Sequence, residues 1–327
     1  MILLNEKEVY GLLDMPTAIA AAKEALERHS QGEADVPLRT NLDIAQHGGQ
    51  ALFMPAHVPA LDCVAVKIVS VYPGNIARGL DSVAATVVVL DASTGQIAAM
   101  MNGTALTRIR TGAVQGAATD LLARPDARVG ALLGAGGQAA TQLEAMLCVR
   151  ELEEVRIYDL DIDRARTFAA EMDVHLARHG ARFVPVTSAA AAADGADVVT
   201  VVTTATTPVL LSEHVADGAH VNGVGAYTPR MQELASDLVA RADLVTIDTD
   251  AALAEAGSLI VPIEAGLLDR ASVVELGRVV SGAHPGRGSA SQLTLFDTVG
   301  SAVLDAVAGQ RVYQTAVATG VGTTVEL

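Results

Sequence analysis

The chain has 327 residues, half of them apolar, and a formal net charge of −16 at pH 7. This length leaves room for two domains, and the negative charge disfavours nucleic acids and anionic membranes as partners, because their phosphate groups would be repelled. No apolar run reaches the roughly 18 residues of a membrane span, and the N-terminus lacks a signal-peptide pattern, so we expect a cytoplasmic protein. Cys63 and Cys148 lie far apart in apolar sequence, which predicts two buried thiols and neither a disulfide nor a metal site.

The first third of the chain is predicted to form an α+β domain. A helix is expected over residues 16–30, because proline stands in its first turn and apolar residues recur at helical spacing. A polar connection follows, and apolar, β-branched runs then predict an antiparallel sheet with strands at residues 50–54, 63–72, 84–90 and 96–101. The turn at 91–95 predicts a hairpin, and a long helix is expected over 104–123.

From residue 128 onward, short strands alternate with helices, which is typical of parallel β-α-β units. Strands are predicted near residues 128–133, 154–158, 182–186, 197–202, 219–222 and 243–247. A short helix is predicted over 189–193, and a last helix, from Gly300 to about Thr319, is expected to return to the first domain. We therefore expect an α/β, doubly wound parallel sheet of Rossmann type over 116–304, inserted in a substrate-binding and dimerisation domain formed by 1–115 and 305–327.

The most informative motif, from Gly134 through Gly136, Gly137 and Gln138 to Ala139, stands where an apolar strand gives way to a helix. Gly134 permits a tight turn, Gly136 lets the backbone approach a pyrophosphate, and Ala139 keeps the helix close to the sheet. The free amides and the positive dipole end of the helix N-terminus attract phosphate groups. The motif therefore predicts that the chain binds a dinucleotide.

Asp159 ends the next predicted strand, 25 residues after Gly134, where a carboxylate binds the ribose hydroxyls of the adenosine. An ordinary helix cap at the strand end is the alternative interpretation. If Asp159 binds the ribose, NAD(H) is favoured, because no arginine follows at once and Asp161 and Asp163 would repel a 2′-phosphate. NADP(H) stays open as the alternative cofactor.

Three cations of the first domain, Arg39, Lys67 and Arg110, stand in apolar or small-residue sequence. Lys67 interrupts a strand of valine, alanine and isoleucine, where an unpaired ammonium is costly to bury. A lysine at a strand edge with its ammonium in water is the alternative interpretation. Arg108 stands two residues before Arg110. The alternative interpretation is that either arginine lies on the exposed surface of the helix. Together the three cations predict a site for a small anion.

Several blocks of sequence, in this order, resemble the ornithine cyclodeaminase/μ-crystallin family over nearly the whole chain. They are Lys67-Ile-Val-Ser-Val-Tyr-Pro-Gly-Asn75, Leu106-Thr-Arg-Ile-Arg-Thr-Gly-Ala113, Gly134-Ala-Gly-Gly-Gln-Ala139, Val221-Asn-Gly-Val-Gly225 with Pro229 and Glu233-Leu234, and Leu295-Phe-Asp-Thr-Val-Gly300. The family includes ornithine and lysine cyclodeaminases, alanine dehydrogenases of archaeal type, and reductases of cyclic and acyclic α-imino acids such as 1-pyrroline-2-carboxylate.

The resemblance implies that Arg39, Lys67 and Arg110 hold the α-carboxylate of the substrate, and that homodimers form through the first domain. It also implies contacts to the cofactor from a residue in the helix after the first domain's sheet, from the loops after two predicted strands, and from the matching block that ends at Gly300. These residues are Thr111, Thr203, Thr204, Thr206, Val224, Gly225, Val299 and Gly300. By itself, the threonine cluster would be interpreted as an ordinary strand-to-loop transition.

Two departures separate this chain from the cyclodeaminases that it resembles. Those enzymes carry an aspartate two residues after the glycine of the Val-Gly pair, where it moves protons to and from the amine. Here Tyr227 stands in that place, either as a proton donor, as a residue that closes the pocket, or as a packing aromatic. Ornithine-using members also place an acid just before Met-Pro, whereas this chain has Gln50-Ala-Leu-Phe-Met-Pro55.

We therefore expect an NAD(H)-dependent oxidoreductase that reduces an α-imino acid to the L-amino acid. The carboxylate is expected on the three cations, the hydride comes from NADH, and Lys67 lends a proton to the imine nitrogen or to a water. Two alternatives stay open. A cyclodeaminase would convert L-ornithine to L-proline and ammonia with bound NAD, and a non-catalytic protein would bind nucleotide and ligand without turnover.

Overall fold

The computed structural model describes residues 1–326, which divide into two compact units. The first unit comprises Met1–Arg110 and the segment from Ser301 onward, and the second comprises Thr111–Gly300. The divisions fall a few residues before the positions expected from the sequence, 115 and 305. No helix among residues 1–326 is long and apolar enough to cross a membrane.

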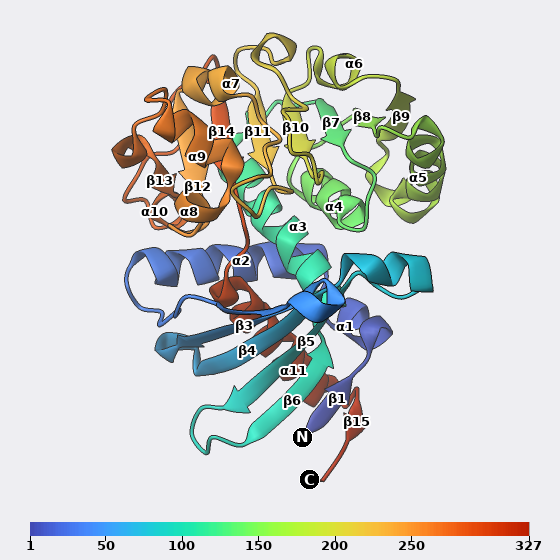
Figure 1. Ribbon diagram of the computed structural model, residues 1–327, viewed down its shortest axis with the longest axis vertical. Helices are drawn as coiled ribbons and strands as arrows, with labels where there is room; N and C mark the ends of the chain where they lie inside the picture. The colour runs from blue at the N-terminus through green and yellow to red at the C-terminus, as the bar shows by residue number, and fades with distance from the viewer. Residues whose placement is uncertain (327) are drawn as a thin grey trace. The chain divides into compact units, whose positions relative to one another are not determined.

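The first unit is built on a seven-stranded sheet in the order β15-β1-β6-β5-β4-β3-β2 (Figure 1). Its strands are β1 (Ile2–Leu4), β2 (Thr40–Ile44), β3 (Gly49–Val58), β4 (Cys63–Val71), β5 (Val83–Asp91), β6 (Ile97–Asn102) and β15 (Thr323–Thr324). Strands β3 to β6 pair antiparallel, as predicted, and β2 pairs antiparallel with β3, whereas β1 pairs parallel with β6. The sequence interpretation takes β2 as part of a polar connection, although Leu42 and Ile44 alternate with polar residues; nearly all its side chains are exposed.

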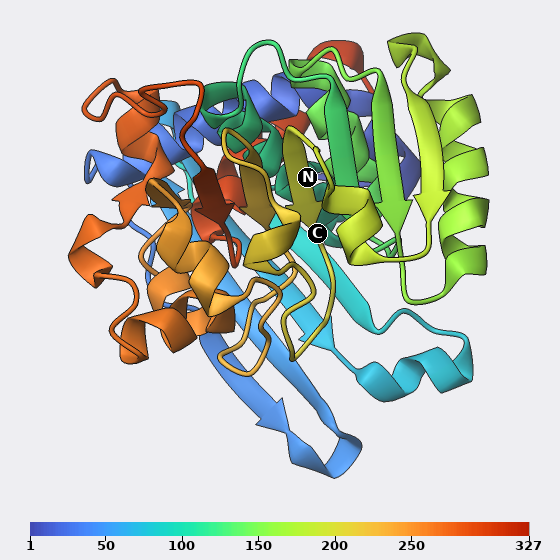
Figure 2. The same ribbon diagram turned by 90° about the horizontal axis from the view of Figure 1, so that it is seen from above.

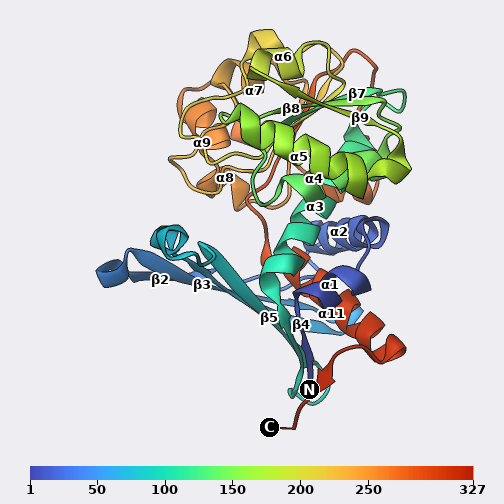
Figure 3. The same ribbon diagram turned by 90° about the vertical axis from the view of Figure 1, so that its right-hand side faces the viewer.

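Helices cover one face of this sheet. Helix α11 (Ala302–Thr319) packs against β3, β4 and β5, α2 (Met15–Ser30) packs against α11, and α1 (Glu6–Leu12) contacts β6 and α11. The approach is close at Gly309, where a Cβ would lie 3.2 Å from the Val87 side chain of β5. Figure 3 shows the three helices on the same side of the sheet, with β2 and β3 projecting beyond them.

The second unit contains an eight-stranded sheet in the order β13-β12-β14-β11-β10-β7-β8-β9, parallel throughout. Figure 2 shows these strands running side by side. They are β7 (Val129–Leu133), β8 (Glu154–Tyr158), β9 (Arg182–Val186), β10 (Val198–Val201), β11 (His220–Gly223), β12 (Leu244–Ile247), β13 (Val274–Glu275) and β14 (Thr294–Asp297). The sequence predicts the first six and misses β13 and β14.

Helices cover both faces of this second sheet. On one face lie α4 (Ala139–Val149) and α5 (Ile162–His175), and on the other lie α6 (Ala189–Ala193), α7 (Ser236–Arg241), α8 (Ala252–Glu255) and α9 (Gly257–Glu264), while α10 (Leu276–Val280) follows β13. Leu132 of β7 packs with α4 and α5, while its neighbours Ala131 and Leu133 pack on the opposite face. The doubly wound, Rossmann-type sheet predicted from the sequence is thereby confirmed.

Helix α3 (Gly103–Leu122) begins in the first unit and continues into the second. In the second unit, buried polar side chains join it to the sheet. Gln115 donates to Thr200 of β10 at 3.3 Å, and Asn222 of β11 donates to Thr119 at 3.1 Å. Among residues 1–326 neither cysteine forms a disulfide. Cys63 is buried as predicted, but Cys148, at the C-terminal turn of α4, is only half-buried.

A stability difference between two helical glycines follows from this packing. Gly112→Ala is expected to lower the free energy of unfolding by about 1–3 kcal/mol, because a Cβ there would lie 2.7 Å from the carbonyl carbon of Thr141. Gly11→Ala is the matched control: its Cβ meets nothing within 4 Å, so it is expected to stabilise α1 by about 0.5–1 kcal/mol. Urea unfolding of both variants measures the difference, and equal midpoints would contradict the close approach.

Candidate active site

Lys67 lies in β4 on the face of the sheet that the helices cover. Along this strand Cys63, Ala65 and Lys67 are buried in alternation, and Lys67 is only 3% exposed. The strand-edge alternative is therefore wrong, because the pleat points the ammonium inward together with the neighbouring apolar side chains.

Arg110 is likewise buried, at 6% exposure, in the part of α3 that belongs to the first unit. Arg108, two residues earlier, points elsewhere and forms an exposed ion pair with Glu6 at 3.2 Å. The helix-surface alternative thus applies to Arg108 and not to Arg110.

One carboxylate serves both buried cations. Asp305 of α11 is 1% exposed; its Oδ1 accepts from Arg110 Nε at 2.8 Å, and its Oδ2 lies 2.6 Å from Lys67 Nζ. In the hydrogen bonds of residues 1–326, Arg110 is engaged only through Nε. Its terminal nitrogens therefore keep the flat donor pair that binds a carboxylate in bidentate fashion.

Arg39, just before β2, is half-buried and acts on the same cluster. Burial lowers the pKa of Lys67 to about 8, Asp305 opposes this change, and the positive charges of Arg110 and Arg39 add to it. Arg39 and Arg110 thus both act on Lys67. The combined charge of these three predicted cations exceeds that of Asp305, the single acid among them.

The glycine loop of the second unit has the geometry that a pyrophosphate requires. Gly134 adopts a φ of 105°, and a Cβ there would lie 2.5 Å from the Val202 oxygen, so glycine is required. Gly136 and Gly137 are exposed, and a Cβ on either would meet nothing within 4 Å. Gln138 precedes α4, and Ala139, the first residue of α4, is buried. The loop thus offers an open backbone surface at the N-terminus of an 11-residue helix, which fits a dinucleotide phosphate.

Asp159 at the end of β8 is tied to this loop, because its Oδ2 accepts from the Ala135 amide at 2.9 Å. Its Oδ1 accepts from the Asp161 amide at 3.0 Å and from Arg164 at 3.3 Å. The carboxylate thus stands beside the glycine turn, the position that a ribose ligand requires. No arginine follows Asp159 directly in the sequence, but Arg164 of α5 reaches back to it in the structure.

Glu233 fixes the loops that follow β10 and β11. This fully buried carboxylate accepts from the amide and hydroxyl of Thr203, at 2.5 and 2.8 Å, and from the amides of Gly225 and Ala226, at 2.7 and 3.0 Å. Burial raises the pKa of Glu233 to about 7 although these four donors lower it. The predicted cofactor residues Thr203 and Gly225 therefore share one internal anchor, and Val224, which follows β11, is buried.

A second acid anchors the loop after β14. Asp248, which follows β12, accepts from the Thr298 hydroxyl at 2.5 Å and from the Gly300 amide at 3.0 Å, where Gly300 has a φ of 76°. Next to Thr298, Asp297 is 1% exposed, and burial together with the charges of Glu233 and Asp248 raises its pKa well above the usual range. The carboxyl ends of β11, β12 and β14 are thus held by buried acids.

The remaining predicted residues occupy less constrained positions. Tyr227 follows β11 in the second unit and is 38% exposed. Thr204 and Thr206 are exposed in the loop after β10, Val299 is half-buried, and Thr111 in α3 is buried. None of these side chains forms a hydrogen bond within residues 1–326, so their assignment to cofactor or substrate stays a prediction.

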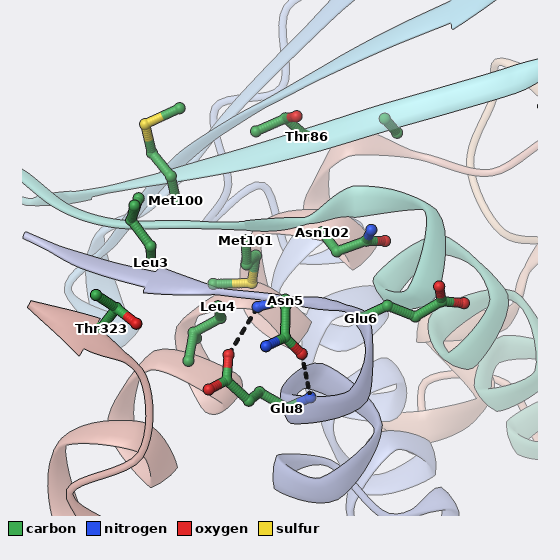
Figure 4. A pocket seen from close by; sticks show the side chains of 11 residues that line it. Leu3, Leu4, Asn5, Glu6, Glu8, Thr86, Met100, Met101, Asn102 and Thr323 are labelled. Atoms are coloured by element: carbon green, nitrogen blue, oxygen red, sulfur yellow. Dashed lines mark hydrogen bonds between the residues drawn. The ribbon is translucent and has the colours of Figure 1, made fainter.

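A depression of about 440 Å³ in the first unit is a second candidate pocket (Figure 4). It lies between β1, β6 and the start of α1, and its wall includes the capping pair Asn5 and Glu8, whose amides and side chains bond reciprocally at 2.8 and 3.1 Å. The residues that line it include Glu6 and Glu8 and neither lysine nor arginine. Its charge is therefore unsuited to an anionic substrate, unlike the cluster around Lys67.

The family model for the ornithine cyclodeaminase/mu-crystallin family matches residues 1–320. The chain belongs to this family. A Delta(1)-pyrroline-2-carboxylate reductase from Bacillus cereus is 36% identical over the full length of both chains. The solved structure of the Thermococcus litoralis Delta(1)-pyrroline-2-carboxylate reductase with NADH and L-proline has a TM-score of 0.94 and 37% identity, covering 99% of this chain and 100% of its own. An archaeal alanine dehydrogenase dimer with bound NAD has a TM-score of 0.92 and 31% identity, with 100% and 99% covered.

Sequence reasoning missed the buried acids of this family member. Asp305 was overlooked, although it is an acid within the apolar run Ala302-Val-Leu-Asp-Ala-Val-Ala, the same kind of contrast that singled out Lys67. Glu233 entered only as part of a matching block, and nothing in its local sequence indicates that it binds four donors.

A substitution in the glycine loop tests its fit to a dinucleotide. Gly136→Val is expected to leave the melting temperature nearly unchanged, because its side chain enters open space. It should weaken NADH binding at least about tenfold, or roughly 1.4 kcal/mol, because the side chain occupies the approach of the pyrophosphate. Fluorescence titration with NADH measures the effect, and Gly11→Val, at an exposed site in the first unit, is the control. Unchanged NADH affinity in Gly136→Val would exclude this loop as the phosphate site.

Proposed function

We propose that the protein is an NAD(H)-dependent reductase of α-imino acids, with 1-pyrroline-2-carboxylate or a small acyclic imino acid as substrate and the L-amino acid as product. The observation that carries this proposal is the buried cluster of Lys67, Arg110 and Asp305. It presents a surplus of positive charge and a free guanidinium edge to a carboxylate. Membership of a family whose relatives reduce imino acids, and a glycine loop suited to a dinucleotide, support it.

In this proposal the chain's own residues orient the substrate and hold its charge. Arg110 binds the substrate carboxylate through Nη1 and Nη2, while Lys67 and Arg39 supply the remaining positive charge. Such fixed donors stabilise the anion without reorganisation, and orientation of the imine carbon lowers the entropic part of the barrier. NADH supplies the hydride when it is bound.

Lys67 is also the proposed proton donor for the imine nitrogen. An acid acts best when its pKa lies near the working pH, and burial lowers that of Lys67 to about 8. Below this pH the ammonium both attracts the carboxylate and carries the proton to be given. Above it the amine does neither.

The side chains disfavour net cyclodeamination. Tyr227 stands where the cyclodeaminases that the chain resembles have an aspartate. No acid stands in Gln50-Ala-Leu-Phe before Met54-Pro55, where ornithine-using members place one. Without a carboxylate, that ammonium would lose a charged partner on leaving water, a cost of a few kcal/mol.

The first experiment measures NADH oxidation at 340 nm with 1-pyrroline-2-carboxylate, 1-piperideine-2-carboxylate, and pyruvate plus ammonia or methylamine. Ammonia release from L-ornithine with NAD is followed in parallel. Oxidation with an imino acid and none with ornithine is expected. Ammonia release without net change in NADH would make the protein a cyclodeaminase, and NADH binding without any turnover would favour a non-catalytic ligand-binding protein.

Lys67→Met is expected to lower kcat/KM for the imino acid by about 10²–10⁴-fold while NADH affinity stays unchanged. Lys7→Met, which removes an exposed ammonium from α1, is the matched control and should leave turnover intact. In the unsubstituted enzyme kcat/KM should fall above about pH 8, because Lys67 then loses its proton. A flat profile up to pH 10, or a fully active Lys67→Met variant, would remove Lys67 from the mechanism.

We further propose that the enzyme is a cytoplasmic homodimer formed through the sheet of the first unit. The face of that sheet opposite α11 is apolar, because Val66, Val88 and Met100 stand side by side on neighbouring strands, and Ile68 nearby is 36% exposed. An apolar face of this kind is typical of a subunit interface. The dimer of the related alanine dehydrogenase supports it.

Light scattering coupled to gel filtration tests the dimer. Twice the chain mass of 33.6 kDa is expected. Ile68→Asp should give the monomer mass, because it places a charge on the apolar face. Val317→Asp is the control, since Val317 of α11 is 55% exposed away from the sheet. A monomeric unsubstituted protein, or a dimer that tolerates Ile68→Asp, would exclude this interface.

A further inference from the structure

Asp305 is an ionisable side chain in an apolar part of α11. Its helix neighbours Val303, Leu304, Ala306 and Val307 are all buried, and Asp305 itself is 1% exposed. An isolated carboxylate in such surroundings is strongly disfavoured, so its retention requires charged partners. It has two, Lys67 and Arg110, and each takes a different oxygen.

The geometry of these two pairs leaves the substrate-binding edges of both cations unused. Asp305 binds Arg110 from the side, at Nε, and not at the end of the guanidinium. This contact engages Nε alone and leaves Nη1 and Nη2 of Arg110 without a hydrogen bond to Asp305. Lys67 is held by one oxygen at 2.6 Å, and an ammonium has three protons, so two remain for other acceptors.

We propose that Asp305 is the positioning residue of the anion site, holding Lys67 as an ammonium and fixing the plane of Arg110 so that both present preset donors to the substrate carboxylate. The inference deepens the proposed function and rests on it for the identity of the anion. Asp305 acts through Lys67 and Arg110 and does not itself touch the substrate.

The charges around Lys67 explain why an acid is required there. The side chains that act on it are Asp305 from α11, Arg110 from α3 and Arg39 from the segment before β2. Burial and both arginines favour the neutral amine, and Asp305 is the one group among these that favours the ammonium. Without Asp305, a lysine whose pKa is about 8 would lose its proton at or below neutral pH.

The protein offers a direct measurement of this effect. Its sequence contains three lysines, Lys7, Lys23 and Lys67, so ¹³C-lysine labelling gives three Cε signals, and Lys67→Met identifies the one from Lys67. Titration of that signal reports the proton on Lys67 without substrate, cofactor or turnover. It therefore remains decisive for Asp305 even when the proposed function fails, which the NADH assay reveals separately.

In the unsubstituted protein the Lys67 signal is expected to titrate near pH 8. Asp305→Asn should move the midpoint down by about 1–3 pH units, the usual effect of an adjacent opposite charge. The alkaline limb of kcat/KM should move with it. Asp62→Asn is the matched control: it removes the same charge from an exposed position beside β4, where asparagine tolerates the φ of 50°, and should change neither midpoint.

An unchanged titration midpoint of Lys67 in folded Asp305→Asn overturns the inference. A shifted midpoint without a matching shift in the alkaline limb of kcat/KM overturns it as well. If Asp305→Asn does not fold, Asp305→Glu carries the test. It keeps the charge but displaces it by one methylene, so the Lys67 midpoint should stay near pH 8 while KM for 1-pyrroline-2-carboxylate rises. An unsubstituted KM in Asp305→Glu would show that the position of the carboxylate is irrelevant.

Discussion

Burial of two cations beside a single acid is the constraint on which the first unit depends. Lys67 comes from β4, Arg110 from α3 and Asp305 from α11. Each would be destabilising alone in this apolar layer, and removal of one partner from a buried pair typically costs about 3–5 kcal/mol. The sheet, the connecting helix and the returning C-terminal helix must therefore be in register for the cluster to form. The return of α11 to the first unit is thus a requirement of the anion site as well as of the core.

The second unit also contains buried acids that bind groups from other elements, and there the bound groups are backbone amides. Glu233 and Asp248 accept amide donors from the loops after β11 and β14, and their acceptor oxygens replace the ladder partners that strands lose at their ends. Because these acids bind backbone amides, the conformation of the loops depends little on the loops' own side chains. Gly225 illustrates the consequence, because a Cβ there would collide with the backbone of Thr203, which the same Glu233 binds. Buried acids thus set the backbone shape of the loops that are predicted to contact the nucleotide.

Sequence patterns are informative here where the physical cause is local. Adjacent residues along the chain are enough to predict the glycine loop and the six strands β7 to β12. They also single out Lys67, because it is a charged residue in an apolar strand. Asp305 and Glu233 do not, because an acid in an apolar run indicates a partner without naming it, and theirs lie on other elements. β13 is missed because its two residues carry no periodicity. β14 is missed although it is as long as β10, β11 and β12, and its parallel pairing with β11 and β12 is what identifies it as a strand.

The overall charge makes this local arrangement necessary. A protein with a net charge of −16 repels an anionic substrate at long range, whereas salt confines such repulsion to about 8 Å at physiological ionic strength. Capture must then come from cations at contact distance, and their attraction is strongest where water is excluded. Exclusion of water, however, lowers the pKa of Lys67 and threatens the charge that the site needs. A buried acid beside the lysine resolves this conflict, provided that it compensates only part of the positive charge and leaves the remainder for the substrate.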